Sequence, residues 1–272
     1  MPSDLGTVKG LYAGPGDHTC TVKTSGTVVC WGGNNYYGQL DVPSTLGPIT
    51  TVAVGNTHNC ALDTSGAVAC WGSDYYHEAT VPADLQLPVA LLAAGYEFTC
   101  AFDAAGDIRC WGPTADFGSD WPPVDLGTVH DLSAGDSAVC ATDTEGRPRC
   151  WGSVGVAKIP ADLTGKLLHI YMGSNFACGL TLAGAVRCWG GSDYNQTKVP
   201  SNLQLRSVAA LSSAGYHSCA INASSTAPGE NNCREQATPG CEARPAGSAC
   251  CAVTMQVLQV LRGAPPARSV LA

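Results

Sequence analysis

A block of thirteen residues recurs along most of this chain, and its period limits the folds open to the sequence. The block from Cys60 to Gly72 reads Cys-Ala-Leu-Asp-Thr-Ser-Gly-Ala-Val-Ala-Cys-Trp-Gly. Edited copies, the last of them incomplete, begin at Cys20, Cys100, Cys140, Cys178 and Cys219. Successive first cysteines are 40, 40, 40, 38 and 41 residues apart. Self-similarity at a fixed period of this size indicates a repeat architecture.

Each block predicts a β-hairpin. In the second block, the apolar runs 60–62 and 68–70 flank residues 63–66, which suit a type I turn closed by a left-handed glycine. Glycine stands six residues after the first cysteine in all five full copies, because only glycine takes a positive φ without steric cost. This turn places Cys60 opposite Cys70 in a non-hydrogen-bonded pair, where side chains approach most closely.

The same register pairs the two cysteines of every full copy. The predicted disulfides are Cys20–Cys30, Cys60–Cys70, Cys100–Cys110, Cys140–Cys150 and Cys178–Cys188. Each would stabilise its hairpin by about 2–3 kcal/mol. The alternative is that the thiols stay reduced and pack as small hydrophobic groups. No metal site or cofactor is expected, because cysteines ten apart across a hairpin do not match the spacing of zinc fingers.

One further strand is predicted upstream of each hairpin. A polar loop follows the Trp-Gly pair that ends the hairpin. The upstream runs, each followed by glycine, are Val8–Ala13, Ile49–Val54, Val89–Ala94, Leu132–Ala134 and Leu167–Met172. Three or four short strands per repeat, with no helical periodicity between them, predict an all-β fold, a β-propeller. The predicted blades cover residues 7–46, 47–85, 86–126, 127–163 and 164–203, with a partial sixth over 204–221. We expect an unclosed ring whose open blade edges allow self-association.

The two ends of the chain depart from the repeat. Residues 222–272 are rich in Ser, Pro, Gly and Ala and are predicted to be a largely disordered tail. Within it, the apolar segment 252–261 predicts a short helix that docks on an open blade edge. The N-terminus has neither the basic start nor the apolar core of a signal peptide. It reads like the inter-blade segment Val42–Gly47, so the chain starts at a repeat boundary and a fragment of a longer protein is one interpretation.

Two aromatic positions recur in the repeat and predict packing. His18, His58 and His217 stand two residues before a first cysteine, where other copies have Phe98, Ala138 and Phe176. A catalytic histidine would not recur at blade intervals and then disappear, so we interpret these three as structural. A tryptophan follows the second cysteine in every full copy, and a large aromatic group at that point fills the space between adjacent blades.

The recurring motifs also resemble a known family. Gly-x-x-His-x-Cys-Ala-Leu, then Gly-x-Val-x-Cys-Trp-Gly and the Gly38–Leu40 turn, resemble the regulator of chromosome condensation repeat family over residues 1–221. The short period and the cysteines are similar to its bacterial branch, which includes beta-lactamase inhibitory protein II. Tryptophan-aspartate repeats would show Trp-Asp where this chain has Trp-Gly, and kelch repeats are longer. The resemblance implies a propeller of this type that acts by binding another protein.

The loops after Trp-Gly are the predicted binding site. They differ from copy to copy, combine aromatic residues with Asp, Asn and Ser, and should emerge at one end of the propeller. That composition suits a protein-binding surface, although the same residues also make ordinary exposed turns. The predicted contact residues are Tyr36, Tyr37, Asp74, Tyr75, Tyr76, Phe117, Asp120, Trp121, Asp193 and Tyr194.

Composition and motifs narrow the function classes. The net charge of −8 argues against a basic nucleic-acid surface, and no apolar run is long enough to span a membrane. No nucleophile elbow or phosphate-binding glycine loop appears, so no catalytic residue is nominated. We predict a non-enzymatic protein-interaction module. The alternatives are a guanine-nucleotide exchange factor, as the name-giving family member is for the GTPase Ran, and a cell-surface structural repeat, which disulfides would favour.

Overall fold

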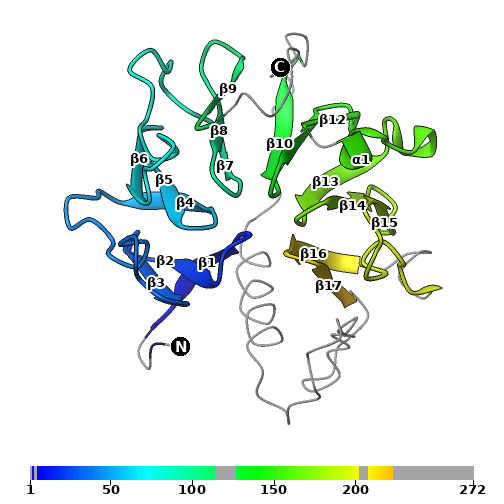
Figure 1. Cartoon of the computed structure of the whole chain (residues 1–272). Coiled ribbons are helices and arrows are strands. Elements are labelled where there is room, and N and C mark those ends of the chain that lie inside the picture. Colours follow the sequence, from blue (N-terminus) through cyan, green and yellow to red (C-terminus); the bar gives the residue numbers. More distant parts are fainter. Residues whose placement is uncertain (1, 3–4, 114–126, 153, 202–207, 223–272) are drawn as a thin grey trace.

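The computed structural model describes residues 2, 5–113, 127–152, 154–201 and 208–222. The described strands form antiparallel sheets that follow one another in chain order around a central axis (Figure 1). Five sheets have three strands each and the last has two. One repeat of about 40 residues forms one sheet. The predicted all-β propeller, with five full blades and a partial sixth, is confirmed.

Each blade is a simple meander. The first two blades contain β1 (Val8–Ala13), β2 (His18–Lys23), β3 (Val28–Gly32), β4 (Ile49–Val54), β5 (His58–Asp63) and β6 (Val68–Gly72). The next two contain β7 (Leu91–Ala94), β8 (Thr99–Phe102), β9 (Ile108–Trp111), β10 (Val129–Ala134), β11 (Ala138–Asp143) and β12 (Pro148–Gly152). The last two contain β13 (Leu167–Met172), β14 (Phe176–Thr181), β15 (Val186–Gly190), β16 (Val208–Ala214) and β17 (His217–Asn222). Two short helices, α1 (Val154–Ala157) and a 3-10 turn (Ala161–Leu163), follow β12.

Two inner strands differ from the predicted bounds. β7 begins at Leu91, two residues later than the apolar run suggests. β10 begins at Val129, earlier than the predicted Leu132, because Val129 pairs with Asp143 on the far side of a β-bulge. The polar residues His130 and Asp131 lie between these two points and conceal the strand from a search for apolar runs.

The hairpin register is the predicted one. Cys60 pairs with Cys70, and the Asp63 N–H donates to the Ala67 carbonyl oxygen at 3.0 Å. Gly66 closes the turn with a φ of 84°. All five predicted cysteine pairs are disulfides with Cα–Cα distances of 4.0 to 4.1 Å. Such short spacing is typical of the non-hydrogen-bonded positions of an antiparallel ladder.

The turn glycines also connect neighbouring blades. The Gly26 carbonyl oxygen accepts the N–H of Ile49, the first residue of the next inner strand, at 3.0 Å. Equivalent bonds join three other turns to the following blades, namely Val89 to Gly66, Leu167 to Gly146 and Val208 to Gly184. These four hairpin turns therefore set the position of the strand that follows each of them around the ring.

The hydrophobic core lies between the blades. Trp71 of the second blade packs with Cys20, Val22 and Val54, so the disulfide of one blade contacts the tryptophan of the next. Trp111 packs against Cys60 and Leu62 in the same way. These contacts confirm for Trp71 and Trp111 that a tryptophan after the second cysteine fills the space between adjacent blades, where a large aromatic side chain buries much apolar area.

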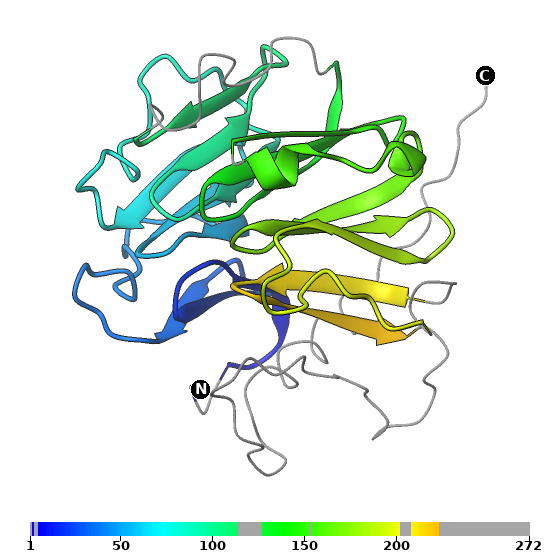
Figure 2. The same ribbon diagram turned by 45° about the vertical axis from the view of Figure 1, so that its right-hand side comes forward.

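Ring closure is not seen among the described strands. The last sheet, β16–β17, lies beside β13–β15 and is separated from β1–β3 in Figure 1 (the same sheet is orange in Figure 2). The expectations for residues 222–272, including the helix over 252–261, lie outside the described residues except for Asn222, which ends β17. In the described part of the chain, no helix has the length and apolarity needed to cross a membrane.

Candidate partner-binding face

Two kinds of loop emerge at the same end of the propeller. Because each blade is an antiparallel meander, the loop after its first strand and the loop after its third strand lie at one end. The Ser73 N–H donates to the Thr57 carbonyl oxygen, and the Gly191 N–H to that of Asn175, both at 2.9 Å. We call this end the loop face. It consists of the described segments 14–17, 33–41, 55–57, 73–80, 95–97, 135–137, 154–158, 173–175, 191–198 and 215–216.

Tyrosines dominate the exposed surface of the loop face. Tyr36 is 86% exposed and Tyr75 is 80% exposed, although tyrosine rings are usually at least half-buried. The predicted Tyr37, Tyr76 and Tyr194 are also exposed. The predicted Asp74 and Asp193 lie exposed in the same loops. Phe117, Asp120 and Trp121 lie outside the described residues.

The tyrosine loops are built on a buried polar anchor. The N–H of Tyr37 donates to Gln39 Oε1 at 3.1 Å, that of Tyr76 to Glu78 Oε2 at 2.7 Å, and that of Tyr194 to Gln196 Oε1 at 2.9 Å. All three anchor side chains are buried. Asp74 also braces its loop, since its two carboxylate oxygens accept from Ala79 N and from Thr80 Oγ1. The tyrosine backbones are therefore held from beneath.

The backbone of the same anchors is bonded to the next blade. The Gln39 carbonyl oxygen accepts from Trp71 Nε1 at 3.0 Å and from Asn59 Nδ2 at 2.8 Å. The Glu78 carbonyl oxygen accepts from Trp111 Nε1 and from Thr99 Oγ1, both at 3.0 Å. These bonds fix each loop relative to its neighbour and lower the entropy that ordering the face on binding would cost.

The sequence prediction did not include the anchors or two further tyrosines. The Gly-Gln-Leu turn of the first blade is replaced by His-Glu-Ala in the second and by Asn-Gln-Thr in the fifth. The recurrence of Gln or Glu at its middle position could have identified Gln39, Glu78 and Gln196 from the sequence. Tyr96 and Tyr216 lie in the loops after the first strand of their blades and are 43% and 44% exposed. Their place on the loop face follows from the meander, but only once both loops of a blade are considered together.

The tyrosines form two groups. In the first, the rings of Tyr75 and Tyr76 meet edge to face with centroids 4.7 Å apart. The pKa of Tyr76 is raised, first by the Glu97 carboxylate and, among smaller causes, by Tyr37. In the second group, the rings of Tyr194 and Tyr216 lie 5.3 Å apart.

The structural interpretation of the histidines agrees with their surroundings. His58 is fully buried, and its Nε2 lies 2.9 Å from Thr99 Oγ1 of the next blade. His18 Nε2 lies 2.8 Å from Asn59 Oδ1 in the equivalent place. Both imidazoles link neighbouring blades inside the core, where a partner protein has no access to them.

Burial makes His58 a source of acid sensitivity. Desolvation lowers the pKa of His58 from 6.5 to about 4, against a smaller opposing effect of Glu78. Since the folded pKa is below the unfolded one, the unfolded chain binds more protons between these values. The stability of the folded protein that depends on neutral His58 is therefore complete above pH 6.5 and is lost as the pH falls towards 4. We expect His58 to cost the fold about 3 kcal/mol between pH 7 and pH 4.

The variant His58→Phe tests this assignment. Phenylalanine occupies the same slot in two other blades, where Phe98 contacts Gly95 and Phe176 contacts Gly173 as His58 contacts Gly55. Thr99 keeps its bond to the Glu78 carbonyl oxygen, so no buried hydroxyl loses its only partner. Denaturant unfolding at pH 7 and pH 4 should show a smaller loss of stability for the variant. An equal loss in both proteins would mean that His58 is not the acid-sensitive group.

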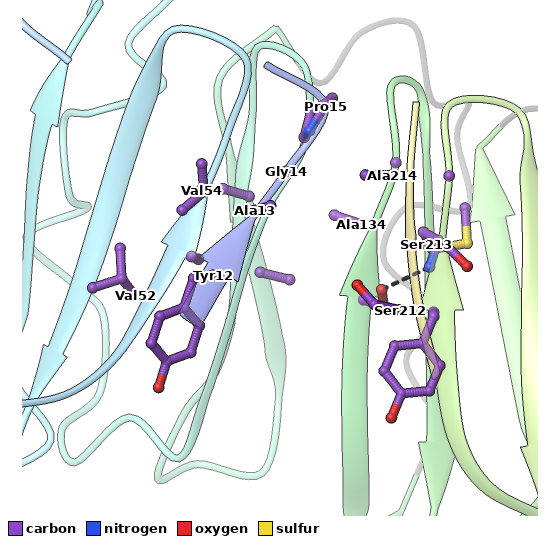
Figure 3. A pocket seen from close by; sticks show the side chains of 18 of the residues that line it. Tyr12, Ala13, Gly14, Pro15, Val52, Val54, Ala134, Ser212, Ser213 and Ala214 are labelled. Carbon is purple, nitrogen blue, oxygen red and sulfur yellow. Dashed lines mark hydrogen bonds between the residues drawn. The ribbon is translucent and has the colours of Figure 1, made fainter. Parts of the chain in front are cut away.

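A cavity lies on the propeller axis. It has a volume of about 280 Å³ and is lined by the inner strands of six blades. Figure 3 shows Tyr12, Ala13 and Val54 on one side of it and Ser212, Ser213 and Ala214 on the other. The ionisable side chains of its lining are Tyr12 and Tyr171, and burial raises the pKa of Tyr12 and raises that of Tyr171 to about 12. Both hydroxyls stay neutral at physiological pH and offer no general base there.

The charged side chains of the described residues suggest no metal centre. Within those residues, no group of three or more His, Cys, Asp or Glu side chains is arranged to hold a metal ion. What the loop face offers chemically is a set of rigidly mounted aromatic rings among hydroxyl, amide and carboxylate groups. Such a surface can bind another macromolecule by contact.

Comparison with known proteins identifies the repeats. The family model of the Regulator of chromosome condensation (RCC1) repeat matches residues 8–39, 49–78 and 168–196. Each of these segments covers the three strands of one blade, almost completely, and part of its polar loop. No curated protein sequence matches the chain.

Several solved structures share the fold. The CRINKLY WD40 ectodomain of the Arabidopsis thaliana receptor kinase ACR4 is 25% identical, with a TM-score of 0.61 over 78% of this chain and 74% of that one. The ectodomain of the Physcomitrella patens receptor kinase CR4 is 27% identical, with a TM-score of 0.67 over 84% of this chain and 61% of that one. Prp20p from Saccharomyces cerevisiae, a protein with binding properties to Gsp1p and histones, is 14% identical. Its TM-score is 0.56 over 73% of this chain and 65% of that one.

Proposed function

We propose that this chain, whose repeats are of the regulator of chromosome condensation type, is a non-enzymatic interaction module that presents its loop face to another protein. The observation that carries the proposal is the exposure of tyrosines on loops that are held rigid from beneath. Tyr36 and Tyr75 expose most of their rings, while Gln39 and Glu78 lock the backbone next to them. Tyrosine gives large contact areas at low entropic cost, and such residues commonly dominate binding energy.

An extracellular setting is the second part of the proposal. Five disulfides persist in oxidising compartments and are rare in the cytosol. The two similar structures with the highest sequence identity given above are ectodomains of receptor kinases. These observations also support the alternative of a surface repeat within a larger protein. Prp20p shares only the fold at its level of identity, so nucleotide exchange on a small GTPase has no support beyond the fold.

Capture of partners by matched variants tests the loop face. In the test variant, Tyr36, Tyr37, Tyr75 and Tyr76 are changed to Ser. The control carries Leu87→Ser and Leu182→Ser, which remove exposed apolar side chains near turns at the opposite end of the propeller. Both variants should keep the melting temperature of the wild type, because all six side chains are exposed. We expect the test variant alone to lose its partner from surface fractions and lysates of the source organism.

The affinity of each variant for a captured partner measures how much the four tyrosines contribute to binding. Hot-spot tyrosines each contribute about 2 kcal/mol or more, so the four substitutions together should weaken binding by at least about a hundredfold. Capture of a GTPase that needs these tyrosines would favour the exchange-factor alternative, and capture of a surface protein would favour the ectodomain setting. Equal capture by both variants would remove the loop face as the binding site.

A further inference from the structure

The first tyrosine group forms one patch over three blades. We call it the three-blade patch and define it as Tyr36, Tyr37, Tyr75, Tyr76 and Tyr96, all exposed. Tyr75 and Tyr76 are in ring contact. The loops of the second and third blades are joined by a hydrogen bond from the Asn56 N–H to the Gly95 carbonyl oxygen at 3.3 Å, and Glu97 and Tyr37 both raise the pKa of Tyr76. Because Tyr96 directly precedes Glu97, the patch continues from the first blade to the third.

The Asp, Glu, Lys and Arg residues around this patch are all acidic within the described loop-face segments. The described loop-face segments of the first three blades, 14–17, 33–41, 55–57, 73–80 and 95–97, contain no Lys or Arg. At their surface they carry the acidic residues Asp17, Asp41, Asp74 and Glu97. Two of these carboxylates, those of Asp41 and Asp74, already accept hydrogen bonds within their loops, but their negative charge still contributes to the potential over the patch.

The rest of the molecule lacks this combination. The fourth and fifth blades carry Lys158 and Lys198 in the equivalent loops, and Lys198 lies in the same loop as Tyr194 of the second tyrosine group. The ion pairs Arg109–Asp84, Arg147–Asp143 and Arg187–Asp162 lie outside the loop-face segments. Aromatic surface with only negative charge around it is therefore confined, within the described residues, to the first three blades.

We propose that the three-blade patch binds a protein segment through arginine side chains, with lysine as the weaker substitute. This inference rests on the proposed function and names the chemistry of the partner. A guanidinium stacks on a tyrosine ring and is attracted by the ring quadrupole, and nearby carboxylates add electrostatic attraction. A segment that carries carboxylates or phosphates would meet the same charges as repulsion, which costs affinity.

A random dodecapeptide library displayed on phage provides the probe. The library is selected on the immobilised wild-type chain and, in parallel, on the variant Tyr37→Ser, Tyr76→Ser. We expect the peptides enriched on the wild type but not on the variant to carry net positive charge and to be rich in arginine. A control variant, Tyr194→Ser, changes an exposed tyrosine of the second group and should retain these peptides.

A synthetic copy of an enriched peptide separates charge from shape. Replacing its arginines with citrulline keeps the planar group and removes the charge, which should weaken binding about tenfold or more. Raising the ionic strength from about 0.05 M to about 0.3 M should also weaken the arginine peptide, because exposed charges are screened. The variant Asp17→Asn, Glu97→Gln should lower its affinity, whereas Asp193→Asn beside the second group should not.

Three results would overturn the inference. They are enrichment of neutral or acidic peptides, recovery of the same peptides on wild type and variant, and binding of the citrulline peptide within twofold of the arginine peptide. Failure to enrich any peptide specific to the wild type also counts against it. None of these results contradicts the proposed function if capture of the natural partner still requires the tyrosines. The two hypotheses can therefore fail separately.

Discussion

Reduction of the five disulfides should bring the propeller close to unfolding at room temperature. Each bond closes a loop between cysteines ten residues apart, which is worth about 2–3 kcal/mol through the entropy of the unfolded chain. Five such bonds amount to more than about 10 kcal/mol, a value similar to the whole stability of a typical domain. We expect treatment with dithiothreitol to lower the melting temperature greatly and to expose the chain to proteolysis.

The disulfides also pack in the interface between blades. Cys20 lies in one core with Trp71 of the next blade, and Cys60 lies in another with Trp111. Cys20 and Cys60 are fully buried and their disulfide partners are only partly exposed, so the folded protein restricts the access of a reductant to these bonds. We therefore expect slow reduction in native buffer and fast reduction in denaturant, which thiol titration over time can measure.

A variant that lacks one disulfide measures the contribution of a single bond to the free energy of unfolding, without a reducing agent. Changing Cys140 and Cys150 together to Ala should lower the free energy of unfolding by about 2–3 kcal/mol through loop entropy, plus the loss of sulfur packing near Val156 and Trp189. Reoxidation of the reduced wild type serves as the control for irreversible damage. If full reduction moves the melting temperature by only a few degrees, the cysteines act mainly as small buried hydrophobic groups.

The sequence predicts the blade well because its determinants are local. The hairpin register follows from Gly66, since a left-handed residue at one position of a short turn fixes every cross-strand pair, including Cys60 and Cys70. The position of Trp71 follows from its recurrence in every full repeat. These features depend on residues that lie within about ten positions of one another.

The candidate site is harder to predict because its supports are contributed by different blades. Gln39 orders the loop of its own blade through its side chain and bonds to Trp71 and Asn59 of the next through its backbone. The backbone role tolerates other residues, and Val156 performs it for Trp189 in the fourth blade. A position whose main contact is a carbonyl oxygen leaves little trace in the amino-acid sequence.

The glycine that follows the inner strand of each of the first five blades has a similarly hidden role, and it gives the second large expected effect. A Cβ atom on Gly135 would lie 2.2 Å from the carbonyl oxygen of Gly173 in the next blade. The equivalent Gly95 would meet the Gly135 carbonyl oxygen at 2.7 Å, so the glycines keep adjacent blades close near the axis. The constraint is steric, because the φ of Gly135 is outside the left-handed range that favours glycine.

The substitution Gly135→Ala should therefore destabilise the propeller by about 3 kcal/mol or more, the upper part of the range for overpacking. The clash is with backbone, which can be relieved only if the fourth and fifth blades move apart. That movement would also weaken the bond from the Asp136 N–H to the Ser174 carbonyl oxygen, which joins the same two blades. Denaturant unfolding of the variant measures the loss.

Gly47→Ala is the matched control for this substitution. Gly47 is exposed, its φ is outside the left-handed range, and a Cβ atom there meets nothing within 4 Å. The same chemical change should leave the free energy of unfolding within about 0.5 kcal/mol of the wild type. Equal stability of the two variants would show that the blades tolerate a methyl group at the axis. The recurrence of glycine at this point would then need an explanation other than the close approach of neighbouring backbones.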